Sequence, residues 1–167
     1  ALQEIIQHTI TRGGRLIIPA FAIGRVEEVL YWIRRLEQER RIGVHPVYLD
    51  SPMANEALVY YRQRRRSLDS DMHSDAEPTG RFTAIASPQQ SKDLMKAGFP
   101  CIVISSSGMA TGGRVLHHLK FGLPDPRNTV LFVGFQSEGT RGRQLLDGAR
   151  EVKIHGQMIA VGARIER

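Results

Sequence analysis

Residues 100–113 read PCIVISSSGMATGG, an apolar run that passes directly into a loop of serines and glycines. Such a short apolar run, rich in β-branched side chains, is typical of a strand that is buried on both faces. Helical spacing then resumes over Arg114–Phe121, so the stretch predicts one strand–loop–helix unit. Parallel strands need a crossover connection of this kind, and the unit therefore favours a parallel sheet.

Similar units recur along the whole chain. Strands are expected at 15–19, 46–50, 82–86, 100–104 and 129–133, and two more at 151–154 and 158–165. Helices are expected at 25–41, at 53–66, from Ser87-Pro88 onward, at 114–121 and at 141–146. The polar, aperiodic stretch 68–80 predicts an exposed loop. We therefore expect residues 1–167 to form a single α/β domain with a Rossmann-like, open, mainly parallel sheet and helices on both faces.

The composition is that of a globular protein that favours polyanions. Of the 167 residues, 41% are hydrophobic and 24% are charged, and the formal net charge is +6. This excess of positive charge favours nucleic acid among the partners. No apolar run is long enough to cross a bilayer, so we expect a cytoplasmic protein without membrane contact. The single cysteine, Cys101, lies in an apolar run, which predicts a buried hydrophobic side chain and not a catalytic thiol.

In open parallel sheets, ligands bind at the loops that leave the carboxyl ends of the strands. One such loop, 105–113, offers small polar residues and glycines, namely Ser105, Ser106, Ser107, Gly108, Thr111 and Gly112. Hydroxyls and a close backbone at the start of a helix suit a phosphate group. The same composition also fits an ordinary loop whose serines cap a helix, and composition alone does not separate the two interpretations.

A second loop, 134–143, has a similar design with more charge. Gly139 gives backbone freedom, Thr140 can cap the following helix, and Arg141 and Arg143 can contact phosphate oxygens. The alternative is a solvated basic helix start, but two arginines beside a glycine turn favour phosphate. Neither loop matches the dinucleotide fingerprint or the phosphate-binding loop with its lysine, which disfavours a mononucleotide cofactor.

Further polar residues are expected at or near the same edge. Asp50 ends a strand, either as a functional carboxylate or as a cap or turn residue, and Ser51 is a natural N-cap. His117 and His118 are expected at the surface, with contact to a bound phosphate as the alternative. The histidines are scattered or adjacent and have no carboxylate at ligand spacing, so no metal site is predicted.

A run of cations closes the helix expected at 53–66: Arg62, Arg64, Arg65 and Arg66. The helix dipole favours cations at this end, which makes a solvated helix end the preferred interpretation. The alternative is a secondary patch that follows a nucleic-acid backbone.

Four segments, taken together and in order, resemble the β-CASP domain of RNA-processing nucleases with a metallo-β-lactamase fold. They are IIPAFAIGRVEE (17–28), YLDSPMA (48–54), SSSGMATGG (105–113) and GFQSEGTRGR (134–143). The resemblance extends over nearly the whole chain. It is strongest to the bacterial and archaeal relatives of ribonuclease J and of the messenger-RNA 3′-end processing endonuclease.

The resemblance implies a domain inserted into a metallo-β-lactamase-type catalytic domain, with single-stranded RNA in the cleft between them. Two zinc ions would be held by histidine and aspartate motifs that this sequence does not contain, so no cofactor and no catalytic residue are expected here. Zinc-activated hydroxide would attack an RNA phosphodiester. This chain would hold the phosphates through loops 105–113 and 134–143 and through Arg25, and would be inactive by itself.

Two other functions stay open from the sequence. The chain could be a stand-alone α/β module that binds nucleotides or proteins. It could also act chiefly as an assembly surface, because nucleases of this kind often form homodimers.

Overall fold

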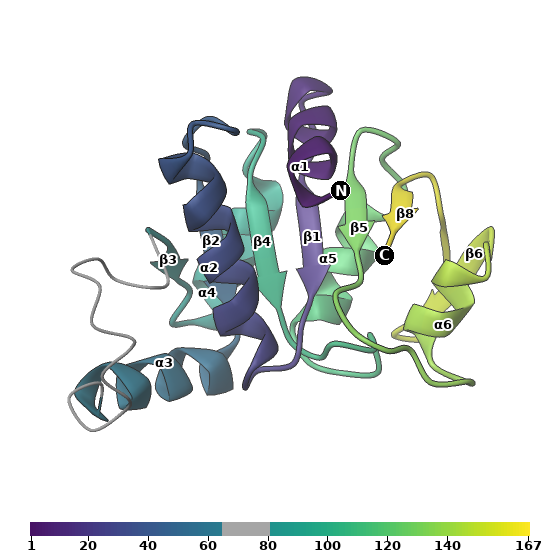
Figure 1. The fold of residues 1–167 in the computed structure, drawn as a ribbon. Helices are drawn as coiled ribbons and strands as arrows, with labels where there is room; N and C mark the ends of the chain where they lie inside the picture. The colour runs from purple at the N-terminus through teal and green to yellow at the C-terminus, as the bar shows by residue number, and fades with distance from the viewer. Residues whose placement is uncertain (65–80) are drawn as a thin grey trace.

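The centre of the fold is a six-stranded sheet whose neighbouring strands all pair in parallel (Figure 1). It is seen in a computed structural model that describes residues 1–64 and 81–167, with only the backbone described for residues 62–64. The spatial order is β3-β2-β4-β1-β5-β8. The strands are β1 (Leu16–Pro19), β2 (Val47–Asp50), β3 (Thr83–Ala84), β4 (Ile102–Ser105), β5 (Thr129–Leu131) and β8 (Arg164–Glu166). The expected α/β fold with a parallel sheet is confirmed.

The connections between these strands are mostly helical, as parallel pairing requires. The helices are α1 (Leu2–Thr11), α2 (Arg25–Gln38), α3 (Pro52–Arg64), α4 (Pro88–Lys96), α5 (Val115–Gly122) and α6 (Arg141–Leu146). Two of them, α4 and α6, start directly after a residue whose side chain caps the helix. The hydroxyl of Ser87 accepts from Gln90 N, and that of Thr140 accepts from Arg143 N, which confirms the expected helix start at Ser87-Pro88 and the expected N-cap at Thr140.

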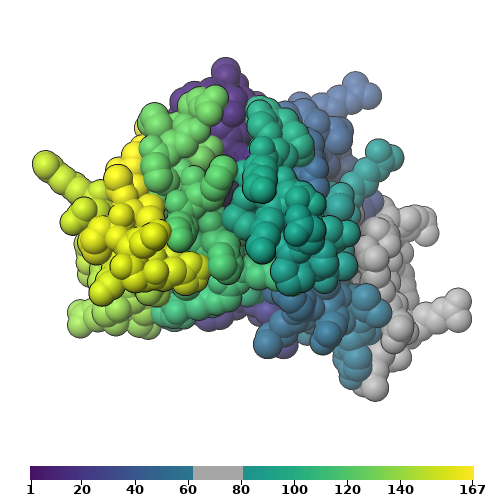
Figure 2. All heavy atoms as spheres, turned by 180° about the vertical axis from the view of Figure 1, so that it is seen from behind, coloured from purple at the N-terminus to yellow at the C-terminus, as the bar shows by residue number. Residues whose placement is uncertain are grey.

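Helices cover both faces of the sheet, and the strand residues alternate between them. Ile18, Leu49 and Ile104 point to the face covered by α1, α2 and α3. Ile17 and Val130 pack with α5 and α6 on the other face, and Val103 packs there with α4. Figure 1 is seen from the α1 and α2 side, and Figure 2 shows the opposite face, where the teal middle part of the chain lies beside the green and yellow C-terminal part. The predicted two-sided burial is therefore confirmed for the four central strands, β2, β4, β1 and β5, whereas the edge strands β3 and β8 are more exposed.

Two parts of the chain differ from the expectation. Helix α1 was not expected, although Leu2, Ile5 and Ile6 already have helical spacing, and its Thr9 hydroxyl bonds Thr129 Oγ1 at 2.7 Å. The prediction of a single strand at 158–165 is wrong. Its first half, β7 (Gln157–Ala160), pairs antiparallel with β6 (Glu151–Ile154), and its second half enters the main sheet as β8.

The break between β7 and β8 follows from a contact with Leu123, which is distant in the sequence. The amides of Gly162 and Ala163 both donate to Leu123 O at 2.8 Å, which turns the chain away from β6. A Cβ built on Gly162 would lie 2.6 Å from Pro124 O, so only glycine fits this approach. Among the other expectations, the loop 68–80 and the side chains of Arg62, Arg64, Arg65 and Arg66 lie outside the described residues.

Candidate functional site

The register of the sheet brings the ends of three strands side by side. Pro19 is paired with Ser105, and Ser105 is paired with Asp50. The loops that follow β1, β2 and β4 therefore start at the same level, at the lower edge of the sheet in Figure 1. This is the edge at which ligands bind in open α/β folds.

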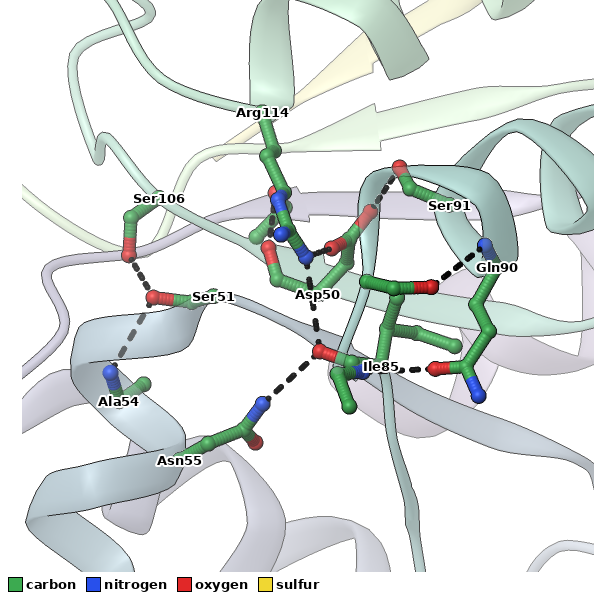
Figure 3. A network of polar contacts seen from close by, with 12 residues as sticks. Asp50, Ser51, Ala54, Asn55, Ile85, Gln90, Ser91, Ser106 and Arg114 are labelled. Atoms are coloured by element: carbon green, nitrogen blue, oxygen red, sulfur yellow. Dashed lines mark hydrogen bonds and ion pairs between the residues drawn. The ribbon is translucent and has the colours of Figure 1, made fainter.

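Asp50 lies within a network of polar contacts at this edge (Figure 3), and its side chain is fully buried. Its Oδ1 accepts from Arg114 Nη1 at 2.7 Å, and its Oδ2 is hydrogen-bonded to His118 Nε2 at 2.7 Å and to the Ser91 hydroxyl. Burial acts to raise the pKa of Asp50, but the hydrogen bonds from His118, Ser91 and Arg114 outweigh it and lower the pKa overall. Asp50 is therefore a charged, buried residue that joins three side chains from other parts of the chain, and it is more than a turn residue.

His118 is buried with 3% exposure, so its expected place at the surface is wrong. Arg114 and His118 lie four residues apart and share one side of α5, which faces Asp50. His117 lies on another side and is exposed, as expected, with its ring 4.7 Å from that of His155. The sequence interpretation overlooked Arg114, although its spacing to His118 was visible.

The Ser91, His118 and Asp50 side chains do not form a nucleophilic triad. In a triad the histidine lies between the nucleophile and the carboxylate. Here the Ser91 hydroxyl donates directly to Asp50, and Ser91 is only 4% exposed. The cluster therefore positions Arg114 and joins α4, α5 and β2, and it has no geometry for covalent catalysis.

Loop 105–113 divides into an inner and an outer part. Ser105 is fully buried and donates to Asp50 O at 2.7 Å, while Ser51 is buried, caps α3 through Ala54 N and contacts Ser106 Oγ at 2.8 Å. The expected N-cap role of Ser51 is thus confirmed. The outer part holds the partly exposed Ser106 and Ser107 and the exposed Thr111.

Ser107 organises the outer part of this loop. Its hydroxyl oxygen accepts from Thr111 N at 3.2 Å and from Gly112 N at 3.3 Å. The first amide of α5, Val115 N, already donates to Ser106 O at 3.0 Å. An anion at this loop would therefore meet hydroxyl groups and the Arg114 side chain more readily than the first amide of the helix.

The loop that follows β5 is locked onto loop 105–113. Gln136 is buried, and its Nε2 donates to Gly108 O at 3.0 Å and to Gly134 O at 3.1 Å. Gly142 N donates to Met109 O at 3.1 Å, and Arg141 Nη1 donates to Ala110 O at 3.3 Å. The two loops therefore form one continuous, pre-organised surface, which we call the double-loop edge (105–113 and 134–143).

Three arginines are predicted to contact phosphate, and they differ in how strongly other groups of the protein already bind them. Arg141 is bound to three backbone oxygens, on Lys153, Ala110 and Thr111, so it serves mainly to join the loops. Arg143 pairs with Asp147 at 2.9 Å, and Arg25 pairs with Glu28 at 2.5 Å. Both of these pairs are solvent-exposed and contribute little to stability, so an incoming phosphate can replace the carboxylate.

Metal-binding side chains do not gather in the part of the chain that the structure describes: no three histidine, cysteine or acidic residues come close enough to share an ion. Over the same residues, no helix has both the length and the apolar character to cross a bilayer. Cys101 is free and fully buried, and burial raises the pKa of its thiol to about 11. This confirms its expected role as a core side chain.

Comparison with known proteins gives one consistent relationship. A family model described as the Beta-Casp domain matches residues 26–145. The chain is 36% identical to Ribonuclease TTHA0252 of Thermus thermophilus over 97% of its own length and 38% of that protein. It is 36% identical to the transcription termination factor FttA of Pyrococcus abyssi, over 93% and 25% of the two lengths. It is 34% identical to an RNase J-like protein of Methanocaldococcus jannaschii, over 98% and 38%. The chain thus spans well under half the length of these relatives.

Proposed function

The chain belongs to the β-CASP family, and we propose that it forms the RNA-holding wall of a metal-dependent ribonuclease. Relatives named as a ribonuclease and as an RNase J-like protein support RNA as the substrate. The reaction of the whole protein would be hydrolysis of an RNA phosphodiester, with a metallo-β-lactamase-type domain as the catalytic partner. A cytoplasmic location would follow from that substrate.

The observation that carries this proposal is the double-loop edge. Its first loop carries the partly exposed Ser106 and Ser107 and leads to Arg114, whose guanidinium is held in place by a buried carboxylate. Only Nη1 of Arg114 has partners among the described residues, on Asp50 and on Ile85 O. A guanidinium has five N–H donors, so Arg114 keeps donors for a phosphate oxygen. Its side chain is 20% exposed, which leaves it reachable from solvent.

Rigidity is the second reason to assign RNA holding to this edge. Gln136, Gly142 and Arg141 tie the two loops together through backbone oxygens. Groups that are already ordered lose little entropy when a strand binds. Contacts to phosphate and sugar position a strand without reading its bases, so low sequence specificity is expected.

The proposal gives this chain no catalytic step. A zinc-activated water requires several histidine or carboxylate ligands around the ion. The described residues do not fit such a centre, because no three ligand-type side chains come together in them. The contribution of the chain is to bind and orient the strand.

The test is a titration of short fluorescent single-stranded RNA by anisotropy at several salt concentrations. The wild-type chain should bind weakly, and salt should weaken the binding further. Arg143→Ala and the double variant S106A/S107A should bind less tightly. Arg143→Ala should also reduce the salt slope by about 0.7 if it removes one phosphate contact.

Arg127→Ala is the matched control. Arg127 is also an exposed arginine in an ion pair, with Asp125, but it lies before β5 at the opposite edge of the sheet. Equal losses of RNA affinity in Arg127→Ala and Arg143→Ala would mean that only net charge matters. If the wild-type chain does not bind RNA at low salt, the proposal is refuted.

Calorimetry with mononucleotides tests the alternative function, a nucleotide-binding module. Tighter binding of a mononucleotide than of RNA would favour that alternative.

A further inference from the structure

Phe21 lies in the loop after β1, between the two loops of the double-loop edge. A Cβ built on Gly108 would be 3.0 Å from Cδ2 of the Phe21 ring, and one built on Gly134 would be 3.7 Å from Cε2. The same edge of the ring therefore rests on the backbone of both loops. A side chain at Gly108 would push the ring away, so glycine is needed there for this contact.

The rest of the ring faces outward. Phe21 is 42% exposed although it is a large apolar side chain next to the core. Phe135, from the loop after β5, is also a large exposed apolar residue of this edge, with 67% exposure. Burying such a ring is strongly favourable in water, so an exposed ring supported by two ordered loops is suited to a ligand.

The surroundings of Phe21 indicate the chemical class of that ligand. Gly108, which supports the ring, belongs to the same loop as the hydroxyls of Ser106 and Ser107. A flat apolar surface beside phosphate-binding groups matches one nucleotide unit, with its base on the ring and its phosphate on the hydroxyls.

We propose that Phe21 is a base-stacking residue, on which an unpaired base of the RNA strand lies while the adjoining phosphate contacts Ser106 and Ser107. This inference rests on the proposed function of the double-loop edge, and it gives a physical reason for binding single strands. In a duplex the bases are already stacked on one another and their faces are not available to a side chain.

The experiment compares three probes with the same protein: a short single-stranded RNA, an abasic oligonucleotide of the same length, and inorganic polyphosphate. All three carry phosphate, but only the first has bases. The wild-type chain should bind RNA more tightly than the abasic strand. Phe21→Ala should weaken RNA binding about 5- to 150-fold, as for other stacking residues, and leave the binding of the other two probes unchanged.

Two variants separate stacking from packing. Phe21→Leu keeps an apolar contact with the two glycines but loses the flat ring, so it should also lose RNA affinity, whereas Phe21→Tyr should keep it. Phe121→Leu is the control, because Phe121 is 57% exposed on α5 and lies away from the two loops. Thermal unfolding of each variant checks that the fold is kept.

The outcomes distinguish the two proposals. If RNA and the abasic strand bind equally, or if Phe21→Leu has no effect on RNA, the stacking inference is wrong while phosphate holding stands. If neither RNA nor polyphosphate binds, both proposals fail. If Phe121→Leu weakens RNA as much as Phe21→Leu does, the effect is not specific to this edge and the inference fails.

Discussion

Replacing Gly142 with alanine tests how strongly the two loops depend on each other. A Cβ at Gly142 would lie 1.7 Å from Gln136 Oε1, 2.8 Å from Gln136 Cδ and 3.1 Å from Met109 O. These approaches are far inside van der Waals contact, so Gln136 would have to leave its position. Helix propensity predicts the opposite result, because alanine is about 1 kcal/mol better than glycine inside a helix.

The magnitude follows from the bonds that Gln136 would lose. Its Nε2 donates to Gly108 O and Gly134 O, and each such bond contributes about 1 kcal/mol, with a further cost of about 1–3 kcal/mol for any buried group left without a partner. After the gain in helix propensity, we expect Gly142→Ala to lower the free energy of unfolding by about 2–4 kcal/mol. For a chain of this size, that corresponds to a decrease in Tm of roughly 4–16 °C.

The measurement is urea unfolding followed by circular dichroism, with Gly112→Ala as the control. Gly112 belongs to the double-loop edge too, but no atom lies within 4 Å of its Cβ position and its φ is not positive. Gly112→Ala should therefore change stability by less than about 0.5 kcal/mol. The double variant Gln136→Ala/Gly142→Ala removes the clash, so the two changes should cost less together than their sum. Wild-type or higher stability of Gly142→Ala would refute the described packing.

Three further predictions concern the buried Asp50, the buried Cys101 and the proposal that this chain binds RNA without cleaving it. Asp50→Asn should destabilise the fold by about 3–5 kcal/mol at neutral pH, because Arg114 and His118 lose a buried charged partner. Since the folded state lowers the pKa of Asp50 below its usual 3.8, its contribution is present above that pH and is lost as the pH falls below it. Acid unfolding monitored by circular dichroism should therefore be less pH-dependent below pH 3.8 in Asp50→Asn than in the wild type. Cys101 should react with a thiol reagent only after unfolding, because it is buried and its pKa is about 11; rapid reaction of the native chain would contradict its placement. The isolated chain should show no zinc-stimulated RNA cleavage in a gel assay, and cleavage that co-purifies with the chain and depends on zinc would overturn that expectation.

The fold could be predicted from the sequence because its signals are local. Each short apolar run predicts a strand, and the residues that follow it predict where the next helix begins, as at Ser87 and Thr140. The error at 158–165 arose where a contact distant in sequence decides the structure. The bonds from Gly162 and Ala163 to Leu123 O divide this segment between two sheets, and no pattern within the segment indicates them.

The candidate site was predicted in outline, but its connections were not. The loops after the strands were recognised from their glycines and hydroxyls, and the rule for open sheets placed them on one edge. The buried side chains that hold these loops in place are determined by contacts across the sheet, which the sequence does not show. Nothing in the sequence around Gln136 indicates that its amide joins Gly108 O to Gly134 O.

The relation between Asp50 and Arg114 shows why a local pattern was insufficient. The two residues are far apart in the sequence, and they meet because β2 and β4 are neighbours, with Asp50 paired to Ser105 at the start of the loop that leads to Arg114. A carboxylate at the end of one strand thereby holds an arginine at the end of the next loop. The buried charge of Asp50 has a cost that Arg114, His118 and Ser91 offset together, so no single one of these residues is informative alone. The proposed function of the edge therefore depends on the strand order, because that order brings polar residues from separate strands together.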